Sequence, residues 1–231
     1  MKVLLSGGSS GLGEVIAKKI LEREDLKQLI ISYRTAPNPI FNGDARVEQV
    51  CIDFSDSNLQ ATVDQFTDDE GFDVLINNAW ESFDLQRFEK MNLKIHSIMM
   101  ENSLLGTLTL SQQIILGMKK AKKGRIINVL SAYLQGDPPM GVSHYVGSKA
   151  YLEAVSRSWK TELKKFRIGV FNVYPGPMRI GMNKDLDERI LEMMALERPS
   201  GKLVTGEEVA NGINNIIDWD ISISGESLII D

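Results

Sequence analysis

The start of the chain constrains the fold most, because an apolar run, a glycine-rich turn and a helical pattern follow one another directly. Val3-Leu4-Leu5 is typical of a buried strand, a Gly/Ser cluster runs from Ser6 to Gly13, and the residues from Glu14 to Ile20 have helical apolar spacing. Glycines let the backbone approach a ligand closely, and a helix N-terminus offers free N–H groups and a partial positive charge. This unit therefore predicts an anion site suited to a nucleotide phosphate.

The glycines of this turn are spaced as Gly7-x-x-x-Gly11-x-Gly13. This spacing differs from the Gly-x-Gly-x-x-Gly of the standard dinucleotide fingerprint, so the alternative is a tight connection that binds nothing. The density of glycine and serine between a buried strand and a helix favours the ligand interpretation. The candidate phosphate-binding residues are Gly7, Ser9, Ser10, Gly11, Leu12 and Gly13.

Strand-like and helical patterns alternate along the rest of the chain. Further strands are expected at residues 27–32, 47–53, 73–77, 125–130, 168–174 and 228–230, and long helices at 93–120 and 143–165. Ser55 is expected to cap a helix that ends near Asp68. This alternation indicates an α/β fold with a doubly wound, Rossmann-like parallel sheet of seven strands and helices on both faces.

The overall composition limits domain organisation and partners. The 231 residues contain no Pro/Gly/Ser-rich linker and no repeat, so residues 1–231 are expected to form a single domain. The net charge of −5 comes without a basic stripe or a lysine-rich amphipathic helix, which argues against nucleic-acid and membrane partners. We see no signal-peptide pattern and no apolar run of membrane-spanning length, so a cytoplasmic location is expected.

Cysteine and histidine usage gives little support to disulfide or metal chemistry. Cys51 is the single cysteine and lies in an apolar, strand-like run, so we expect a buried thiol in a reducing compartment. The two histidines lie far apart in the sequence. His96 has no evident partner, and His144 is expected on the surface. We therefore expect no metal site.

The residues after the second and third expected strands bear on which nucleotide is bound. Arg34 lies 21 positions after Gly13, and no acidic residue occurs between Gln28 and Asn42. A site for NAD commonly has a carboxylate about 20 residues after the glycine turn, whereas an arginine there can pair with the 2′-phosphate of NADP. Arg34 therefore favours NADP (NADPH) over NAD, the alternative being a solvated surface arginine. Asp53, at the end of the third expected strand, is either a contact for the adenine or a helix-start residue.

A tyrosine and a lysine lie one helical turn apart in Tyr145-Val146-Gly147-Ser148-Lys149. Residues four apart share one face of a helix, so the ammonium group of Lys149 is expected near the phenol of Tyr145. A free tyrosine has a pKa of about 10, too high for efficient acid–base work at neutral pH, and a nearby cation lowers it. We therefore expect Lys149 to lower the pKa of Tyr145.

Two more polar residues fall where the same crevice is expected. Ser131 ends the fifth expected strand, and Asn102 lies inside a long helix, where asparagine is a poor helix former. Each also has a plain structural interpretation, as a strand-end serine and a helix-surface asparagine. Their coincidence with the tyrosine–lysine pair and the glycine turn favours a catalytic site.

With these residues in view, the chain resembles the short-chain dehydrogenase/reductase family from Val3 to Asp231. The glycine turn resembles the family's cofactor-binding turn, Asn77-Asn78-Ala79 resembles its Asn-Asn-Ala-Gly element, and Pro175-Gly176 matches the turn that borders the nicotinamide. The residues that match its catalytic tetrad are Asn102, Ser131, Tyr145 and Lys149. The cofactor contacts that the resemblance adds are Asn78, Ala79, Tyr145, Lys149, Pro175 and Gly176.

The resemblance implies hydride transfer between a nicotinamide and a small-molecule carbonyl or alcohol substrate. Tyr145 would pass the proton to or from the substrate oxygen, and Ser131 would steady the charge that develops there. Lys149 would tune the tyrosine and bind the nicotinamide ribose, and Asn102 would hold a water in a proton relay. The resemblance also implies a homodimer or homotetramer formed through the two long helices.

The sequence departs from the family pattern at two positions. Trp80 stands where the family usually has glycine, and both packing under a loop and a role beside the substrate remain open. After Pro177 the chain continues Met178-Arg179-Ile180, without the threonine that often contacts the cofactor amide.

A short amphipathic helix is expected after the sixth strand. Its apolar residues, at helical spacing, are Leu186, Ile190, Met193 and Met194. Packing of that face on the domain is favoured over a mobile lid above an apolar substrate.

The sequence thus predicts an NADP-dependent oxidoreductase. Two alternatives stay open: a non-catalytic NADP-binding redox sensor, and an epimerase or dehydratase that uses the same tetrad and returns the hydride within one cycle. Net consumption of the nucleotide distinguishes the leading interpretation from both.

Overall fold

The computed structural model of the chain describes residues 1–66, 71–82, 84–183, 186–196, 198 and 200–231. Its strands are β1 (Lys2–Leu5), β2 (Gln28–Tyr33), β3 (Val47–Cys51), β4 (Val74–Asn77), β5 (Gly124–Val129), β6 (Ile168–Pro175) and β7 (Ser227–Ile230). Its α-helices are α1 (Gly11–Leu21), α2 (Leu59–Asp64), α3 (Lys94–Met99), α4 (Gly106–Ala121), α5 (Ser143–Leu163), α6 (Glu188–Leu196) and α7 (Gly206–Asp218). A π-helical segment, η3 (Met100–Leu105), joins α3 to α4. The short 3-10 segments are η1 (Pro39–Phe41), η2 (Phe88–Lys90), η4 (Ala132–Leu134), η5 (Lys164–Phe166), η6 (Gly181–Asn183) and η7 (Ile221–Ile223).

The strands form one sheet in the order β3-β2-β1-β4-β5-β6-β7. Every neighbouring pair is parallel, which confirms the predicted doubly wound α/β fold. The chain builds outward from β1 to β3 and then returns to place β4 on the other side of β1. Ligands in such sheets bind beyond the carboxyl ends of the strands at this switch point.

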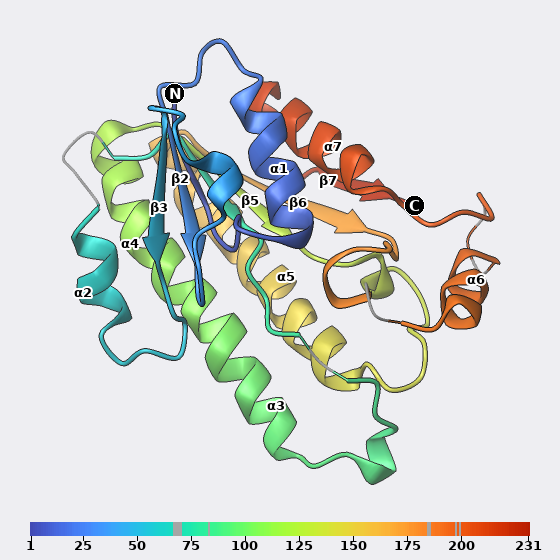
Figure 1. The fold of residues 1–231 in the computed structure, drawn as a ribbon. Helices are drawn as coiled ribbons and strands as arrows, with labels where there is room; N and C mark the ends of the chain where they lie inside the picture. Colours follow the sequence, from blue (N-terminus) through green and yellow to red (C-terminus); the bar gives the residue numbers. More distant parts are fainter. Residues whose placement is uncertain (67–70, 83, 184–185, 197, 199) are drawn as a thin grey trace.

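Helices cover both faces of the sheet (Figure 1). Successive residues of a strand point to opposite faces, so Val3 and Leu5 of β1 join the core formed with α1 and α7, while Leu4 joins the core on the other face. The first core includes Ile16 of α1, and the second includes Ile114 of α4. Burial on both faces explains why the central strands read as continuous apolar runs.

The long helix predicted at residues 93–120 is interrupted. The chain is α-helical in α3, widens into the π-helical segment η3, and becomes α-helical again in α4. A π-helical turn inserts an extra residue into the hydrogen-bond ladder and is often found at functional sites. Asn102 lies inside this widened segment.

The predicted burial of Cys51 is wrong. Cys51 is exposed, since it is the last residue of β3, which is an edge strand of the sheet. Its thiol lies 3.5 Å from the carbonyl oxygen of Arg34, at the end of the neighbouring strand β2.

The helix predicted to begin after Ser55 is shorter and starts later. Helix α2 begins at Leu59, with Asn58 as the residue before it, and ends at Asp64. Ser55 instead donates its hydroxyl to the carboxylate of Asp53 at 2.7 Å. Asp68, the predicted end of this helix, lies outside the described residues.

Helix α6 is present, but its buried face differs from the predicted one. Leu191 and Met194 are buried, whereas Met193 is 57% exposed. The helix therefore packs through a narrower stripe than the four spaced apolar residues indicated.

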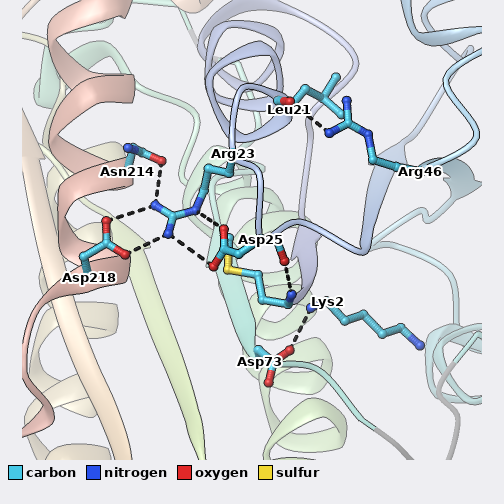
Figure 2. A network of polar contacts seen from close by, with 9 residues as sticks. Lys2, Leu21, Arg23, Asp25, Arg46, Asp73, Asn214 and Asp218 are labelled. Atoms are coloured by element: carbon cyan, nitrogen blue, oxygen red, sulfur yellow. Dashed lines mark hydrogen bonds and ion pairs between the residues drawn. The ribbon is translucent and has the colours of Figure 1, made fainter.

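A polar network fastens the ends of the strands that lie away from the switch point (Figure 2). Arg23, just after α1, donates to Asp218 of α7 at 2.7 Å and to Asn214 at 3.1 Å, and it also pairs with Asp25. The backbone N–H of Lys2, at the start of β1, donates to the Asp73 carboxylate at 2.7 Å. The network joins α1 to α7 and β1 to the start of β4.

None of the helices within the described residues combines the length and apolar character needed to cross a membrane. The described residues also bring together no group of three His, Cys, Asp or Glu side chains that could hold a metal ion.

Candidate active site

A cavity of about 730 Å³ opens at the carboxyl ends of the strands, at the switch point. Residues distant in sequence meet on its walls because the parallel strands all end on the same side of the sheet. Every candidate site residue predicted from the sequence lines it: Gly7, Ser9, Ser10, Gly11, Leu12, Gly13, Arg34, Asp53, Asn78, Ala79, Asn102, Ser131, Tyr145, Lys149, Pro175 and Gly176.

The glycine turn between β1 and α1 needs glycine for conformation and for space. Gly7 and Gly11 have φ angles of +65° and +56°, in the left-handed region that favours glycine. A Cβ atom on Gly13 would lie 2.0 Å from the carbonyl oxygen of Gly7. Ser10 does not cap α1 with its side chain, so the amide groups of the first turn remain available to an anion in the cavity.

Hydrogen bonds that the sequence did not predict hold this turn against the loop after β4. The hydroxyl of Ser6 accepts the N–H groups of Asn78 and Ala79 at 2.9 and 3.0 Å. Asn78 donates its amide to the carbonyl oxygens of Ser6 and Gly7 at 3.0 and 3.1 Å. The two loops at the switch point are therefore one hydrogen-bonded unit, which gives Asn78 a structural task beside any contact with a ligand.

Arg34 lies on the cavity wall but already has an acidic partner. Its guanidinium donates to the carboxylate of Glu81 at 2.5 Å, and this hydrogen bond raises the pKa of Arg34. The Arg34 side chain is 56% exposed, whereas that of Glu81 is 17% exposed. Glu81 was not predicted, because it is 47 residues from Arg34 in sequence and meets it only once β2 and β4 flank β1.

Asp53 lies near this pair without touching it directly. Hydrogen bonds from the hydroxyl and N–H of Ser55, at 2.7 and 2.9 Å, lower the pKa of Asp53, with a smaller contribution from Arg34. The helix-start interpretation of Asp53 is wrong, because α2 begins only at Leu59. Asp53 lines the cavity, and its contact with the adenine stays a prediction.

Three of the four predicted catalytic residues are buried together. Tyr145 and Lys149 lie in the first turns of α5, and Ser131 follows β5 at the start of η4; their exposed fractions are 6%, 2% and 6%. The ammonium nitrogen of Lys149 lies 5.9 Å from the centre of the Tyr145 ring, on the same face of the helix as predicted. A hydrogen bond links Tyr145 to Ser131.

The predicted lowering of the tyrosine pKa by the lysine is wrong in this state of the site. Burial raises the pKa of Tyr145 to about 12, and the hydrogen bond with Ser131 only partly opposes it. Burial also lowers the pKa of Lys149 to about 7. The lysine donates to the carbonyl oxygen of Val129 at 2.6 Å, and the causes that shift the pKa of Tyr145 are burial, the Ser131 hydrogen bond and Tyr133.

Asn102 reaches the cavity from η3. Helix α3, which directly precedes η3, brings the two histidines together. The ring of His96 in α3 lies 6.1 Å from that of His144 and 6.4 Å from Phe88. His144 is only 1% exposed, so the prediction that it lies on the surface is wrong. The reason is that α3 packs against the start of α5. Burial, and to a lesser degree His96, lowers the pKa of His144.

Three buried asparagines form a ladder beneath the site. Asn77 donates to Asn128 at 2.9 Å, and Asn128 donates to Asn172 at 3.1 Å, across the paired ends of β4, β5 and β6. The ladder ends on Ser111 of α4 and Ser156 of α5, each 2.9 Å from an asparagine amide. The sequence did not predict this alignment. The three asparagines lie on separate strands, and only the register of the sheet brings them opposite one another.

The two departures from the family pattern fall at the cavity wall. Trp80 lines the cavity, and its ring lies under the ammonium group of Lys149, 3.7 Å from its centre. Met178 also lines the cavity and forms a parallel bridge with Val204. Gly176, which lies between these two residues in the sequence, donates its N–H to the carbonyl oxygen of Ile230, and this hydrogen bond fixes the turn after β6.

Comparisons with known proteins agree with this arrangement. The chain is 27% identical to the 3-oxoacyl-[acyl-carrier-protein] reductase FabG of Vibrio cholerae, over 97% of this chain and 93% of that protein. Its fold is similar to that of a 3-ketoacyl-(acyl-carrier-protein) reductase from Brucella melitensis complexed with NADH, with a TM-score of 0.86, 20% identity and coverage of 100% and 96% of the two chains. It is also similar to the fold of YwfH, an NADPH dependent reductase involved in bacilysin biosynthesis, with a TM-score of 0.85, 20% identity and the same coverage.

The family assignment follows from a match over most of the chain. The family described as short chain dehydrogenase matches residues 1–191, which include the glycine turn, Ser131, Tyr145 and Lys149. The fold, with its seven parallel strands, agrees with that match. The chain therefore belongs to the short-chain dehydrogenase family of oxidoreductases.

Proposed function

We propose that this protein is an NADP-dependent reductase of a carbonyl compound, with Tyr145 as the proton donor. The observation that carries the proposal is the convergence of Tyr145, Ser131 and Lys149 with the glycine turn on one cavity of about 730 Å³. In this proposal residues 1–231 act as one nucleotide-binding domain.

The residues of the cavity fit a nicotinamide nucleotide. A Cβ atom at Gly13 would collide with the carbonyl oxygen of Gly7, so glycine keeps the turn in this shape. The uncapped first turn of α1 would present N–H groups to a pyrophosphate. Arg34 stands where a 2′-phosphate would be recognised, and its fixed positive charge supports NADP over NAD. Asn78, Ala79, Pro175 and Gly176 would border the nucleotide.

The chemistry follows from the protonation state of the buried groups. A bound nicotinamide nucleotide would supply the hydride that reduces the carbonyl carbon. With a pKa of about 12, the phenol of Tyr145 is protonated at neutral pH but is a weak acid. It would give its proton to the carbonyl oxygen as the addition of hydride makes that oxygen strongly basic. Ser131, already hydrogen-bonded to that phenol, would steady the charge on the same oxygen, and Asn102 would hold a water that returns the proton.

The proposed substrate class is a 3-oxoacyl thioester. The FabG relative is named as a 3-oxoacyl-[acyl-carrier-protein] reductase and aligns over nearly the whole chain. The cavity supports this class because Tyr133, Met178 and Ile180 also line it and add apolar surface. We propose the reduction of the ketone to the secondary alcohol, with one hydride and one proton added.

The test is loss of NADPH absorbance with a panel of 3-oxoacyl thioesters, simple ketones and aldehydes, each repeated with NADH. We expect net consumption of NADPH, fastest with a thioester and slower with NADH. Conversion of substrate without net consumption would instead support an epimerase or dehydratase. NADPH binding with no conversion of any compound would support a redox sensor.

We also propose that the protein self-associates through the face built by its two long helical segments. Large apolar side chains stand about half exposed there, at Ile98 (47%), Leu105 (52%), Leu116 (53%) and Tyr151 (50%). Sedimentation analysis is expected to show a homodimer or homotetramer, and a monomer at all concentrations would contradict this.

A further inference from the structure

Trp80 contacts the most deeply buried charged group of the site. It follows Asn78 and Ala79 in the loop after β4 and stands half-buried in the cavity wall. The ammonium nitrogen of Lys149 lies 3.7 Å from the centre of the Trp80 ring, over its face. A cation in this position is attracted by the ring quadrupole, most strongly where water is excluded.

The position of the indole ring is set by packing. Trp80 packs against a small core of Leu104 in η3, Leu130 just after β5, Leu152 in α5 and Tyr174 in β6. Its ring nitrogen is buried and makes no hydrogen bond within the described structure. A buried N–H without a partner costs free energy, so the ring nitrogen does not help to hold the ring in this position. Apolar contacts and the ammonium group hold it instead.

The surroundings of Lys149 show how the Trp80 ring can affect the charge of the lysine. Lys149 is 2% exposed, and its nitrogen contacts the carbonyl oxygen of Val129 on one side and the Trp80 face on the other. Burial is the cause that lowers its pKa to about 7. The other titratable or charged side chains that line the same cavity are Tyr33, Arg34, Asp53, Glu81, Tyr133 and Tyr145.

We propose that Trp80 is a positioning residue for Lys149: its ring excludes water from the ammonium group and holds it by cation–π contact. This rests on the proposed function only in giving Lys149 a nucleotide to bind. Glycine at this position would leave the lysine hydrated. In this protein the charge of Lys149, and with it the affinity for an anionic nucleotide, becomes sensitive to pH near neutrality.

The sign of the effect follows from the pKa of a base lowered by burial. Lys149 is charged below about pH 7 and loses its proton as the pH rises through that value, whereas a hydrated lysine stays charged to about pH 10. NADPH binding to the wild-type protein should therefore weaken about tenfold between pH 6 and pH 9. In Trp80→Gly it should change by less than about twofold to threefold over the same range.

A first measurement needs neither nucleotide nor substrate. The chain has three tryptophans, so Trp159→Phe with Trp219→Phe leaves Trp80 as the single emitter. We expect its fluorescence to titrate with a midpoint near the Lys149 pKa of about 7, because the ammonium group contacts the ring. The same background with Lys149→Met should lose this transition. A transition that persists without the lysine, or none at all, would overturn the proposal.

Calorimetric titration with NADPH at a series of pH values is the second measurement. Trp80→Phe keeps an aromatic face and should retain most of the wild-type pH dependence of NADPH binding. It also serves as the folded comparison if Trp80→Gly loses structure. Trp159→Phe alters the same small core without touching Lys149 and should behave as wild type. Equal pH dependence in wild type, Trp80→Phe and Trp80→Gly would contradict the proposal. A normal fluorescence titration with no NADPH binding at any pH would instead contradict the proposed function.

Discussion

At the scale of single residues, the pairing of Arg34 with Glu81 would affect how tightly the site binds a nucleotide phosphate. The guanidinium that is proposed to bind the 2′-phosphate already bonds a carboxylate at 2.5 Å. The N–H of Glu81 donates to the buried hydroxyl of Ser103 at 2.9 Å, which holds the acidic residue at the cavity wall. In the proposed site, Glu81 would therefore compete with a 2′-phosphate for Arg34 and repel it.

Removal of this competitor should strengthen recognition of the 2′-phosphate. We expect Glu81→Gln to tighten the binding of 2′,5′-ADP by about twofold to fivefold and to leave 5′-AMP almost unchanged, since an exposed ion pair contributes about 1 kcal/mol or less. Calorimetric titration of both compounds checks this. Glu101→Gln removes the same charge from an exposed position beside Asn102 and is the control.

Each outcome of this titration has a separate meaning. An unchanged ratio of the two affinities in Glu81→Gln would show that Glu81 does not compete. Equal binding of the two compounds to the wild-type protein would show that Arg34 does not read the 2′-phosphate, and the preference for NADP would fall.

For single residues, the sequence predicted position along a helix but not burial. Spacing placed Tyr145 and Lys149 on one face of a helix, and the structure agrees. Their pKa values depend on burial, which no local pattern states, so the direction expected for Tyr145 was wrong. His144 was misjudged for the same reason, because the packing of α3 on α5 buries it.

At the scale of elements, the asparagine ladder fixes the strand ends from which the site is built. Asn77, Asn128 and Asn172 are at most 8% exposed and face one another across three strands. Their side-chain amides join α4, through Ser111, to α5, through Ser156. The ladder therefore connects the sheet to the helix that carries Tyr145.

Loss of the central asparagine should be costly. Asn128→Ala removes two hydrogen bonds and leaves one side-chain N–H of Asn77 and the side-chain oxygen of Asn172 without the partner they had in Asn128. We therefore expect the free energy of unfolding to fall by about 2–4 kcal/mol. Urea denaturation measures it. Asn211→Ala, at an exposed position of α7, should change it by less than about 0.5 kcal/mol. A loss below about 1 kcal/mol in Asn128→Ala would refute a structural role for the ladder.

The elements themselves were largely predictable, and their interruptions were not. The seven predicted strands are all present. Burial on both faces gives the central strands an unbroken apolar signal, whereas the edge strands β3 and β7 are only partly buried. The π-helical turn at Asn102 leaves the apolar period almost intact, so the sequence indicated one continuous helix. The ladder was invisible for a related reason, since it requires the register of three strands that are far apart in the chain.

At the scale of the whole molecule, the two ends of the sheet have different tasks. The carboxyl ends of the strands carry the cavity, and the opposite ends are fastened by the network around Arg23 (Figure 2). Arg23 is 14% exposed and joins α1 to Asp218 at the end of α7. This separation allows stability and activity to be altered independently.

A substitution at the fastened end should lower stability alone. Arg23→Met keeps the apolar length of the side chain but removes its bonds to Asp218, Asn214 and Asp25, and we expect a loss of about 1–2 kcal/mol with kcat unchanged at a temperature where the protein is folded. Thermal unfolding and steady-state kinetics together check this. Arg157→Met, which disrupts a more exposed pair with Glu153 at 3.9 Å, should cost less than about 0.5 kcal/mol. A fall in kcat with unchanged stability would mean that the two ends of the sheet are coupled.

The most direct test of the proposed reductase is the Tyr145→Phe variant, assayed by loss of NADPH absorbance with a substrate that the wild-type protein reduces. Phenylalanine keeps the ring in its buried place and removes the proton that the substrate oxygen is to receive. We predict that kcat falls by about 100-fold to 10,000-fold while calorimetry shows NADPH affinity within about threefold of wild type. Turnover close to that of the wild-type protein would contradict the assignment of Tyr145 as the proton donor.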